Sequence, residues 1–443
     1  MYMFIIIILS VVVMVIAISK FKIHPFIVLT VIAIAVGLLC GMGGEEVIDT
    51  VKGGFGSILG SIGIVILAGT IIGTILEKTG AALTMANSIL KLVGKDKTAL
   101  TMAATGYVTG IPVFCDSGFV ILSPISRALA AQSGKSLAVT ATALSAGLYA
   151  THCLVPPTPG PIAMAGTLGA NLGLTIGIGL IVSIPAVIAG LLYATKVASK
   201  IEIPANEEYS VEELQEKYGK LPSALHSFSP ILIPIILIAF KSFADFPSHP
   251  FGESGFASFI TFIGNPVIAL ILGIIVAMTL VPKSEKSHTL EWVTIGVTNS
   301  AGILAITGAG GAFGAILKSL PIADFLSASL LHLSLGVFLP FIIAALLKTA
   351  MGASTVAMIV TSSMVAPLMA TMGFDSEIAK VLVIMAIGAG SMTVSHANDS
   401  FFWVVSQFSD MSTEQAYKCQ TGVTAVMGIT TIIFVAIIAA FAI

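Results

Sequence analysis

Charge is what this chain most lacks. Only 9% of its 443 residues are Asp, Glu, Lys or Arg, whereas 56% are hydrophobic. A soluble domain usually carries about 25% charged residues, so this composition excludes an ordinary soluble protein. No basic run is present that would bind nucleic acid. The composition indicates an integral membrane protein, and at about 20 residues per span its length accommodates about 10–12 spans.

Cysteine is scarce, and the common catalytic motifs are missing. The four cysteines include no CxxC pair, which argues against a disulfide framework or a metal centre. The chain also contains no GxSxG, HExxH or Walker sequence, the patterns of serine hydrolases, zinc proteases and nucleotide-binding loops. We therefore expect no enzyme, no cofactor and no metal, and transport driven by an ion gradient or by the substrate's own gradient.

The few lysines predict the topology. Residues 2–19 lack the basic start and the cleavage site of a signal peptide, so we interpret them as the first span. Lysines follow the first and third predicted spans, and acidic residues follow the second. Because cytoplasmic loops are enriched in Lys and Arg, we expect the N-terminus outside, in a multi-pass protein of the bacterial inner membrane.

A polar stretch divides the chain. Residues 198–227 are expected to form a cytoplasmic linker between an N-terminal transmembrane half, residues 1–197, and a C-terminal transmembrane half, residues 228–443. Landmarks in the two halves recur about 240 residues apart: Gly69 and Gly73 match Gly310 and Gly314. Duplicated halves with interrupted apolar segments are typical of secondary transporters. The predicted fold is an all-α polytopic membrane protein with two inverted repeats and broken or re-entrant helices.

The sequence TGIPVFCDSGF, Thr109–Phe119, is the first interruption. Proline breaks a helix interior, and a charged side chain such as Asp116 is costly in a bilayer. Their combination predicts a broken helix that lines a polar cavity. A carboxyl group in such a place can hold a proton, so Asp116 is a candidate for proton coupling; a water-exposed loop is the alternative. Arg127, the only arginine, is expected to bind a carboxylate or to anchor a helix end.

The sequence THCLVPPTPGPIAMAG, beginning at Thr151, is the second interruption. Its four prolines in six residues exclude a continuous helix. We expect a helix to restart after Pro161 and to direct its free N–H groups at an anion. His152, Thr158 and Gly160 are therefore candidate substrate-binding residues, although His152 can equally be a structural histidine.

The third interruption is KTAMGASTVAMIVTSS, which begins at Lys348. Gly352, Ser354 and Thr355 place small and hydroxyl-bearing residues in an apolar region and are candidate substrate ligands. Close helix packing is the alternative explanation. Lys348 is expected either to attract an anion or to extend its ammonium group to the membrane interface.

The fourth interruption is GAGSMTVSHANDSFFWV. It carries His396, Asn398, Asp399 and Ser400 between two apolar segments. Such mixed donors and acceptors suit a polyhydroxylated substrate, so His396, Asn398 and Ser400 are candidate ligands and Asp399 is a second candidate for proton coupling. The alternative is an extramembrane turn in which Asp399 caps the next helix.

These motifs resemble the gluconate:proton symporter (gluconate permease) family over nearly the full length. The resemblance rests on KFKIHPFIVL, on VPPTPGPIAMAG, on NLG at 171–173 and on SHANDSFFWV. It implies import of sugar acids with protons, membership of the ion transporter superfamily, re-entrant hairpins and, often, an elevator-like homodimer. Two positions depart from the family pattern. Thr158 stands where these permeases tend to have histidine, and Asp116 where they tend to have glutamate. Both departures change the site, so glycerate, another aldonate or D-serine is an alternative to gluconate.

We therefore predict a proton-coupled symporter that imports a sugar acid or a small hydroxy-monocarboxylate, such as gluconate or glycerate. Its expected partners are the substrate, protons and the lipid bilayer, without nucleic acid. One alternative is a sodium-coupled carboxylate transporter that binds sodium through backbone carbonyls near Gly110 and Gly352. Another is a cation/proton antiporter of the same superfamily. An intramembrane enzyme is a more distant alternative, because the neighbours His152 and Cys153 point apart on a helix.

Overall fold

The computed structural model describes residues 6, 9–10, 12–14, 16–17, 21, 23–94, 97–204, 221–244, 251, 255–320, 336–396 and 399–442. Within these residues every regular element is helical, as the composition predicted. The longer helices are α2 (Pro25–Leu39), α3 (Gly44–Lys78), α4 (Ala81–Val93), α5 (Thr98–Thr109), α6 (Cys115–Ser133), α7 (Leu137–Leu154), α8 (Pro159–Leu168), α9 (Leu172–Lys196), α11 (Ala224–Ala244), α12 (Gly255–Ile263), α13 (Pro266–Met278), α14 (Thr289–Ser319), α16 (Phe338–Met351), α17 (Ser354–Val365), α18 (Glu377–Met392), α19 (Ser400–Phe408) and α21 (Gly422–Ala442).

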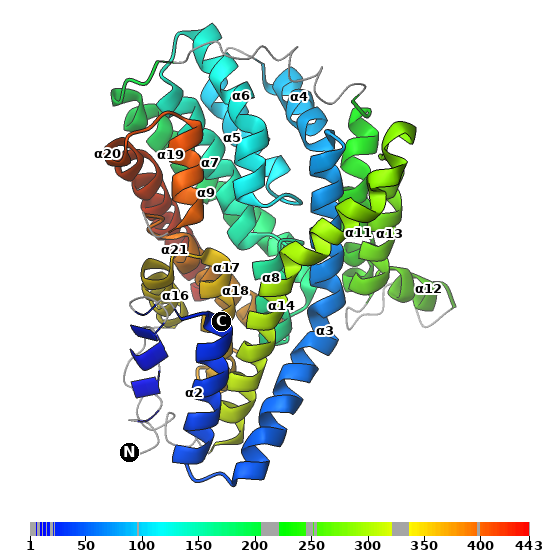
Figure 1. Ribbon diagram of the computed structural model, residues 1–443, viewed down its shortest axis with the longest axis vertical. Coiled ribbons are helices and arrows are strands. Elements are labelled where there is room, and N and C mark those ends of the chain that lie inside the picture. Colours follow the sequence, from blue (N-terminus) through cyan, green and yellow to red (C-terminus); the bar gives the residue numbers. More distant parts are fainter. Residues whose placement is uncertain are drawn as a thin grey trace.

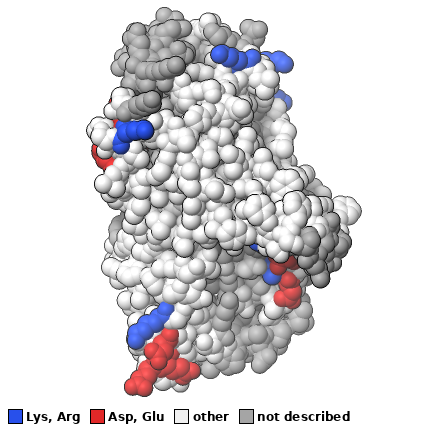
Figure 2. All heavy atoms as spheres, turned by 90° about the vertical axis from the view of Figure 1, so that its right-hand side faces the viewer, with Lys and Arg blue, Asp and Glu red and all other residues white. Residues whose placement is uncertain are grey.

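The helices are those of a multi-pass membrane protein. Among the described residues, five are long and apolar enough to cross a bilayer, or up to seven if each of two bent pairs counts as one span. Figure 2 shows a face with few charged residues, and those that are visible lie near its edges. A large uncharged surface is expected of a protein that is surrounded by a hydrocarbon layer. Most of the first predicted span and residues 205–220 of the predicted linker lie outside the described part. The count of 10–12 spans, the linker and the division into halves stay predictions.

All four predicted interruptions break a helix. The breaks fall between α5 and α6, α7 and α8, α16 and α17, and α18 and α19. One detail of the prediction is wrong: α8 begins at Pro159 rather than after Pro161. The reason is that proline is well tolerated in the first turn, where its missing N–H would have no intrahelical partner.

Helices from the two parts of the chain pack against each other around these breaks. The helix α8 packs on α17, and α6 packs on α19 (Figure 1). The long helices α3 and α14 lie side by side, as do α9 and α21. The helices on either side of the first two breaks, α5 to α8, have counterparts of similar order and spacing in α16 to α19, whereas the inverted twofold relation between the two parts stays a prediction.

The glycines that marked the repeat allow close approach. A Cβ atom on Gly73 of α3 would lie 2.6 Å from the carbonyl oxygen of Pro112, and one on Gly69 would lie 2.9 Å from that of Pro157. On α14, a Cβ on Gly310 would lie 2.5 Å from Ser363 Oγ. The helix α3 therefore packs directly on the breaks before α6 and α8, and these glycines serve helix packing.

Candidate functional site

Short helices that begin at the four breaks meet near the centre of the protein. Ser400, the first residue of α19, donates to Asp116 in the first turn of α6 at 3.4 Å. Thr355, in the first turn of α17, lies 3.5 Å from His152 near the end of α7. A Cβ on Gly160 of α8 would lie 3.8 Å from the Cα of Thr355. Residues from all four interrupted segments therefore contribute to one region, the polar centre.

The main electrostatic feature of the polar centre is a buried ion pair. Lys348 Nζ lies 2.6 Å from Asp399 Oδ2, and the side chains are 0% and 5% exposed. Lys348 Nζ also donates to the carbonyl oxygen of Gly352. The expectation that Lys348 reaches the membrane interface is therefore wrong, because its ammonium group is held by two oxygens inside the protein.

Asp399 has further partners. Ser395 Oγ donates to its Oδ2 at 2.5 Å, and the Tyr149 hydroxyl lies 3.5 Å from the same oxygen. Its Oδ1 accepts the backbone N–H of Phe401 at 3.2 Å and so caps α19. The alternative prediction placed Asp399 in an extramembrane turn as the cap of the next helix. Asp399 does cap α19, but it is only 4% exposed. A buried carboxylate needs such compensation.

Asp116 is compensated far less. Its described hydrogen bond is the long one from Ser400, and the described residues place it in no ion pair. It lies at the start of α6, where free N–H groups and the helix dipole favour a negative charge. Of the two predicted proton-coupling residues, Asp116 is thus the one whose carboxylate contacts no cation among the described residues.

His152 is buried in an aromatic setting. Its ring stacks on Tyr149, with centroids 6.3 Å apart and planes 8° apart, and lies 6.2 Å from the ring of Phe114. Its Nε2 faces the hydroxyl of Thr355. Among the described residues its Nδ1 has no hydrogen-bond partner, although buried polar atoms normally have one. His152 therefore retains unused capacity to bind a ligand.

The other predicted ligands differ in how far they are already engaged. Thr158 Oγ1 donates to its own turn at Val155, 2.6 Å away, and Gly160 packs tightly on Met358. His396 Nε2 lies 2.9 Å from the carbonyl oxygen of Thr349. Ser354 and Thr355 lie in the first turn of α17. Asn398 lies outside the described residues.

Three residues of the polar centre were not among the predicted site residues: Lys348 as an ion-pair partner, Tyr149 and Ser395. Two of them had a signal in the sequence. Tyr149 and His152 are three apart on a helix and share a face. A lysine inside an apolar segment usually pairs with an acid, and this rule applies to Lys348. Ser395 had none, because its role depends on the fold of the fourth break.

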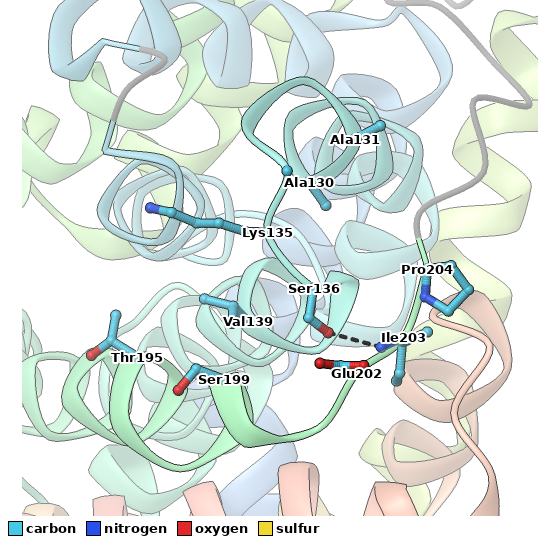
Figure 3. Close-up of a pocket in the computed structure, with 11 residues that line it drawn as sticks. Ala130, Ala131, Lys135, Ser136, Val139, Thr195, Ser199, Glu202, Ile203 and Pro204 are labelled. Atoms are coloured by element: carbon cyan, nitrogen blue, oxygen red, sulfur yellow. Dashed lines mark hydrogen bonds between the residues drawn. The ribbon is translucent and has the colours of Figure 1, made fainter.

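A separate cavity lies at the far ends of α6 and α7. It has a volume of about 940 Å³ and is lined by residues that include Lys135, Ser136 and Glu202 (Figure 3). Ser136 bridges the backbone there, donating to Ile201 and accepting from Ile203. The lining contains no residue of the polar centre and borders Pro204, the last residue described before residue 221. Its size alone therefore does not make it the substrate site.

Broken helices whose starts meet in a buried, charged centre define a class of proteins, the secondary transporters of membranes. Residues 2–441 match the model of a family described as GntP family permease. The chain belongs to this family, as the motifs indicated.

Sequence relatives agree with this assignment. A permease of Haemophilus influenzae is 36% identical over 90% of this chain and 84% of its own length. A gluconate permease of Pseudomonas aeruginosa is 33% identical over 95% and 94%, and the D-serine transporter DsdX of Escherichia coli is 32% identical over 94% and 93%.

The fold has solved counterparts. The YdaH transporter of Alcanivorax borkumensis superposes with a TM-score of 0.70 at 14% identity, covering 95% of this chain and 99% of its own. MtrF of Neisseria gonorrhoeae gives 0.68 at 15% identity, covering 96% of each chain. At these identities the likeness concerns the fold alone.

Proposed function

We propose that this protein is a proton-coupled symporter that imports a hydroxylated monocarboxylate, such as gluconate or glycerate, across the bacterial inner membrane. The observation that carries the proposal is the charge arrangement of the polar centre. One acid, Asp399, is neutralised by Lys348, whereas a second, Asp116, has no described cation in contact. A centre of this kind can take up one proton and one anion.

The substrate carboxylate would bind at the start of α17. This helix begins at Ser354 without a side-chain cap, so its first N–H groups are free to hold an anion. The hydroxyl of Thr355 and the ring of His152 lie beside them. The start of α8 suits an anion less well than the sequence suggested, because two of its first three residues, Pro159 and Pro161, have no N–H.

The coupling proton would reside on Asp116. Protonating Asp399 would leave the buried ammonium of Lys348 without its counter-charge, which is costly. Protonating Asp116 breaks no ion pair and removes a charge from a partly buried position. Asp116 therefore meets the requirement for proton uptake better than Asp399.

The relatives limit the substrate. One is named a gluconate permease and another a D-serine transporter. Gluconate, glycerate and D-serine share a carboxylate next to a carbon that bears a polar group, and each has a hydroxyl. The carboxylate-binding start of α17 with its neighbouring hydroxyls fits this shared part. Chain length and the amino group then distinguish the candidates.

Transport would follow from movement of one helix bundle against another around the polar centre. The remaining topology belongs to the same proposal: the N-terminus outside, and a cytoplasmic linker between residues 198 and 227. A homodimer is part of the resemblance to the family and is proposed on that ground.

Uptake into proteoliposomes tests the proposal. Labelled gluconate, glycerate and D-serine would be offered in sodium-free buffer, with and without an inward proton gradient. We expect accumulation of at least one acid only when the gradient is present. Accumulation that needs sodium instead would contradict proton coupling, and the absence of uptake under both conditions would contradict the substrate class.

A further inference from the structure

The ammonium group of Lys348 occupies an oxygen-lined position inside the protein. Its described partners are the carbonyl oxygen of Gly352 and the carboxylate oxygen Oδ2 of Asp399. Lys348 is 0% exposed and Asp399 4%. Moving an ammonium ion out of water is expensive, so these oxygens must replace its hydration.

The backbone explains why a carbonyl is available there. Gly352 ends α16 with φ +85°, a conformation that glycine adopts without strain. The end of a helix carries free carbonyl groups and the negative end of the helix dipole. Carbonyls of this kind, at unwound segments and helix C-termini, bind the sodium ion in transporters that are built from broken helices.

We propose that the ammonium group of Lys348 is a tethered cation that takes the place of a bound sodium ion between the third and fourth breaks. The group presents one positive charge to a carbonyl and a carboxylate, as sodium would. It is covalently attached, so it neither enters nor leaves during transport. Joining Gly352 to Asp399 also holds the start of α17 close to the start of α19, whatever the external sodium concentration.

Two other roles for Lys348 fit less well. An ammonium at the membrane interface would be exposed, and this one is not. A ligand for the substrate carboxylate would need a free charge, whereas Asp399 already holds Lys348 at 2.6 Å and is itself fixed by Ser395. The same contact argues against a sodium ion at the Gly352 carbonyl, because the ammonium group already lies there.

Thermal stability of purified full-length protein tests the inference without knowledge of the substrate. Lys348→Ala removes the ammonium and leaves room between the carbonyl and the carboxylate for a small cation. We expect sodium chloride to raise the melting temperature of this variant by at least about 3 °C relative to choline chloride. Methylammonium chloride should act similarly. The wild-type protein should shift by less than about 1 °C, because its site is filled.

Two controls isolate the site. Lys348→Ala with Asp399→Ala removes the carboxylate as well, so the sodium response should disappear. Lys380→Ala is matched in chemistry: Lys380 Nζ lies 2.8 Å from Glu377 Oε1 and 3.4 Å from the carbonyl oxygen of Gly169, but its side chain is 25% exposed. Water can replace this ammonium, so we expect no sodium response.

Several results would overturn the inference. One is stabilisation of the wild-type protein by sodium as large as that of Lys348→Ala. Another is a Lys348→Ala protein whose melting temperature responds to neither sodium nor methylammonium. A third is a Lys348→Ala protein that does not fold in either cation, although the double variant with Asp399→Ala folds. If neither alanine variant folds, the effect of sodium chloride on the melting temperature of the wild-type protein decides. A shift of less than about 1 °C supports the inference, and a larger shift contradicts it. A second measurement compares uptake by the wild-type protein in sodium and in choline, and we expect equal accumulation in both. Only this measurement rests on the proposed function. Absence of all uptake would contradict the proposed function and leave the thermal result standing.

Discussion

Ser400 Oγ lies 3.4 Å from Asp116 Oδ1, and this contact joins the first turns of α6 and α19. The two helices come from segments 284 residues apart in the chain. The contact places the least compensated acid of the polar centre beside a helix start that the other acid, Asp399, caps. Protonation of Asp116 would thus change a contact between α6 and α19.

Asp116→Asn is expected to abolish gradient-driven accumulation. An amide keeps the size of the side chain but cannot gain or lose a proton. Exchange of labelled for unlabelled substrate across the membrane should survive, because binding at α17 does not require the proton to leave. The measurement is uptake with a proton gradient beside counterflow without one. Asp49→Asn, at a position whose side chain is 79% exposed, is the control and should behave as wild type. Normal accumulation by the Asp116 variant would disprove the assignment.

One proton per monocarboxylate is the expected stoichiometry, and the cycle should be electroneutral. Lys348 and Asp399 cancel each other, so Asp116 supplies the single titrating charge. At equilibrium the substrate should concentrate about tenfold for each pH unit of gradient. A potassium diffusion potential set with valinomycin should leave that ratio unchanged. A ratio that follows the potential would show that net charge moves with the substrate.

Thr355→Val should weaken substrate binding without blocking coupling. Valine has the shape of threonine but lacks the hydroxyl, and a hydrogen bond to a charged group contributes about 1.5–3 kcal/mol. The expected loss of affinity is about 10- to 100-fold, measured from substrate-induced thermal shifts. Thr361→Val is the matched control on the same helix, since its buried hydroxyl has no hydrogen-bond partner among the described residues. An equal loss of affinity in both variants would place the carboxylate elsewhere.

The sequence predicted the breaks well because each depends on local chemistry. The proline run that begins at Pro156 stops the preceding helix, and Gly352 with its positive φ ends another. The ion pair between Lys348 and Asp399 could not be predicted from local sequence in the same way. Lys348 and Asp399 are 51 residues apart, and their contact depends on how α16, α18 and α19 pack. Identifying Asp399 as the acid that Lys348 neutralises therefore required the structure.

The second break stays a predicted anion site, although its prolines weaken that prediction. The run PPTPGP indicated a helix start, and α8 does begin there. The prolines that stop the preceding helix also remove the N–H donors that an anion would use. The third break, with Ser354 and Thr355 after Gly352, interrupts the helix through glycine and keeps its donors.

The contact between Arg127 and Asp410 predicts a pH-dependent contribution to stability outside the spans. Arg127 Nη1 lies 2.5 Å from Asp410 Oδ2, and Nη2 donates to the Phe408 carbonyl, so the arginine anchors a helix end. The hydrogen bond from Arg127 lowers the pKa of Asp410 below its usual value. The pair therefore stabilises the folded protein above the unfolded pKa of the acid, and the contribution is lost as pH falls through the folded pKa.

Arg127→Gln should accordingly lower stability at pH 7 by at most about 1 kcal/mol, because Asp410 is 54% exposed and solvent screens the pair. Melting curves of variant and wild type should converge as the pH falls below the ordinary range for an aspartate. A difference that persists unchanged at low pH would mean that packing, rather than charge, carries the effect.

Gly73→Ala is expected to destabilise the protein, whereas Gly60→Ala on the same helix should not. A Cβ on Gly73 would lie 2.6 Å from the carbonyl oxygen of Pro112, so α3 would have to move away from the first break. A Cβ on Gly60 meets nothing within 4 Å, and alanine is favoured over glycine in a helix by about 1 kcal/mol. Melting temperatures of the two variants should move in opposite directions. Since the first break leads directly into Asp116, Gly73→Ala should also reduce proton-driven uptake in the protein that remains folded. Equal stability of the two variants would show that α3 does not rest on the break.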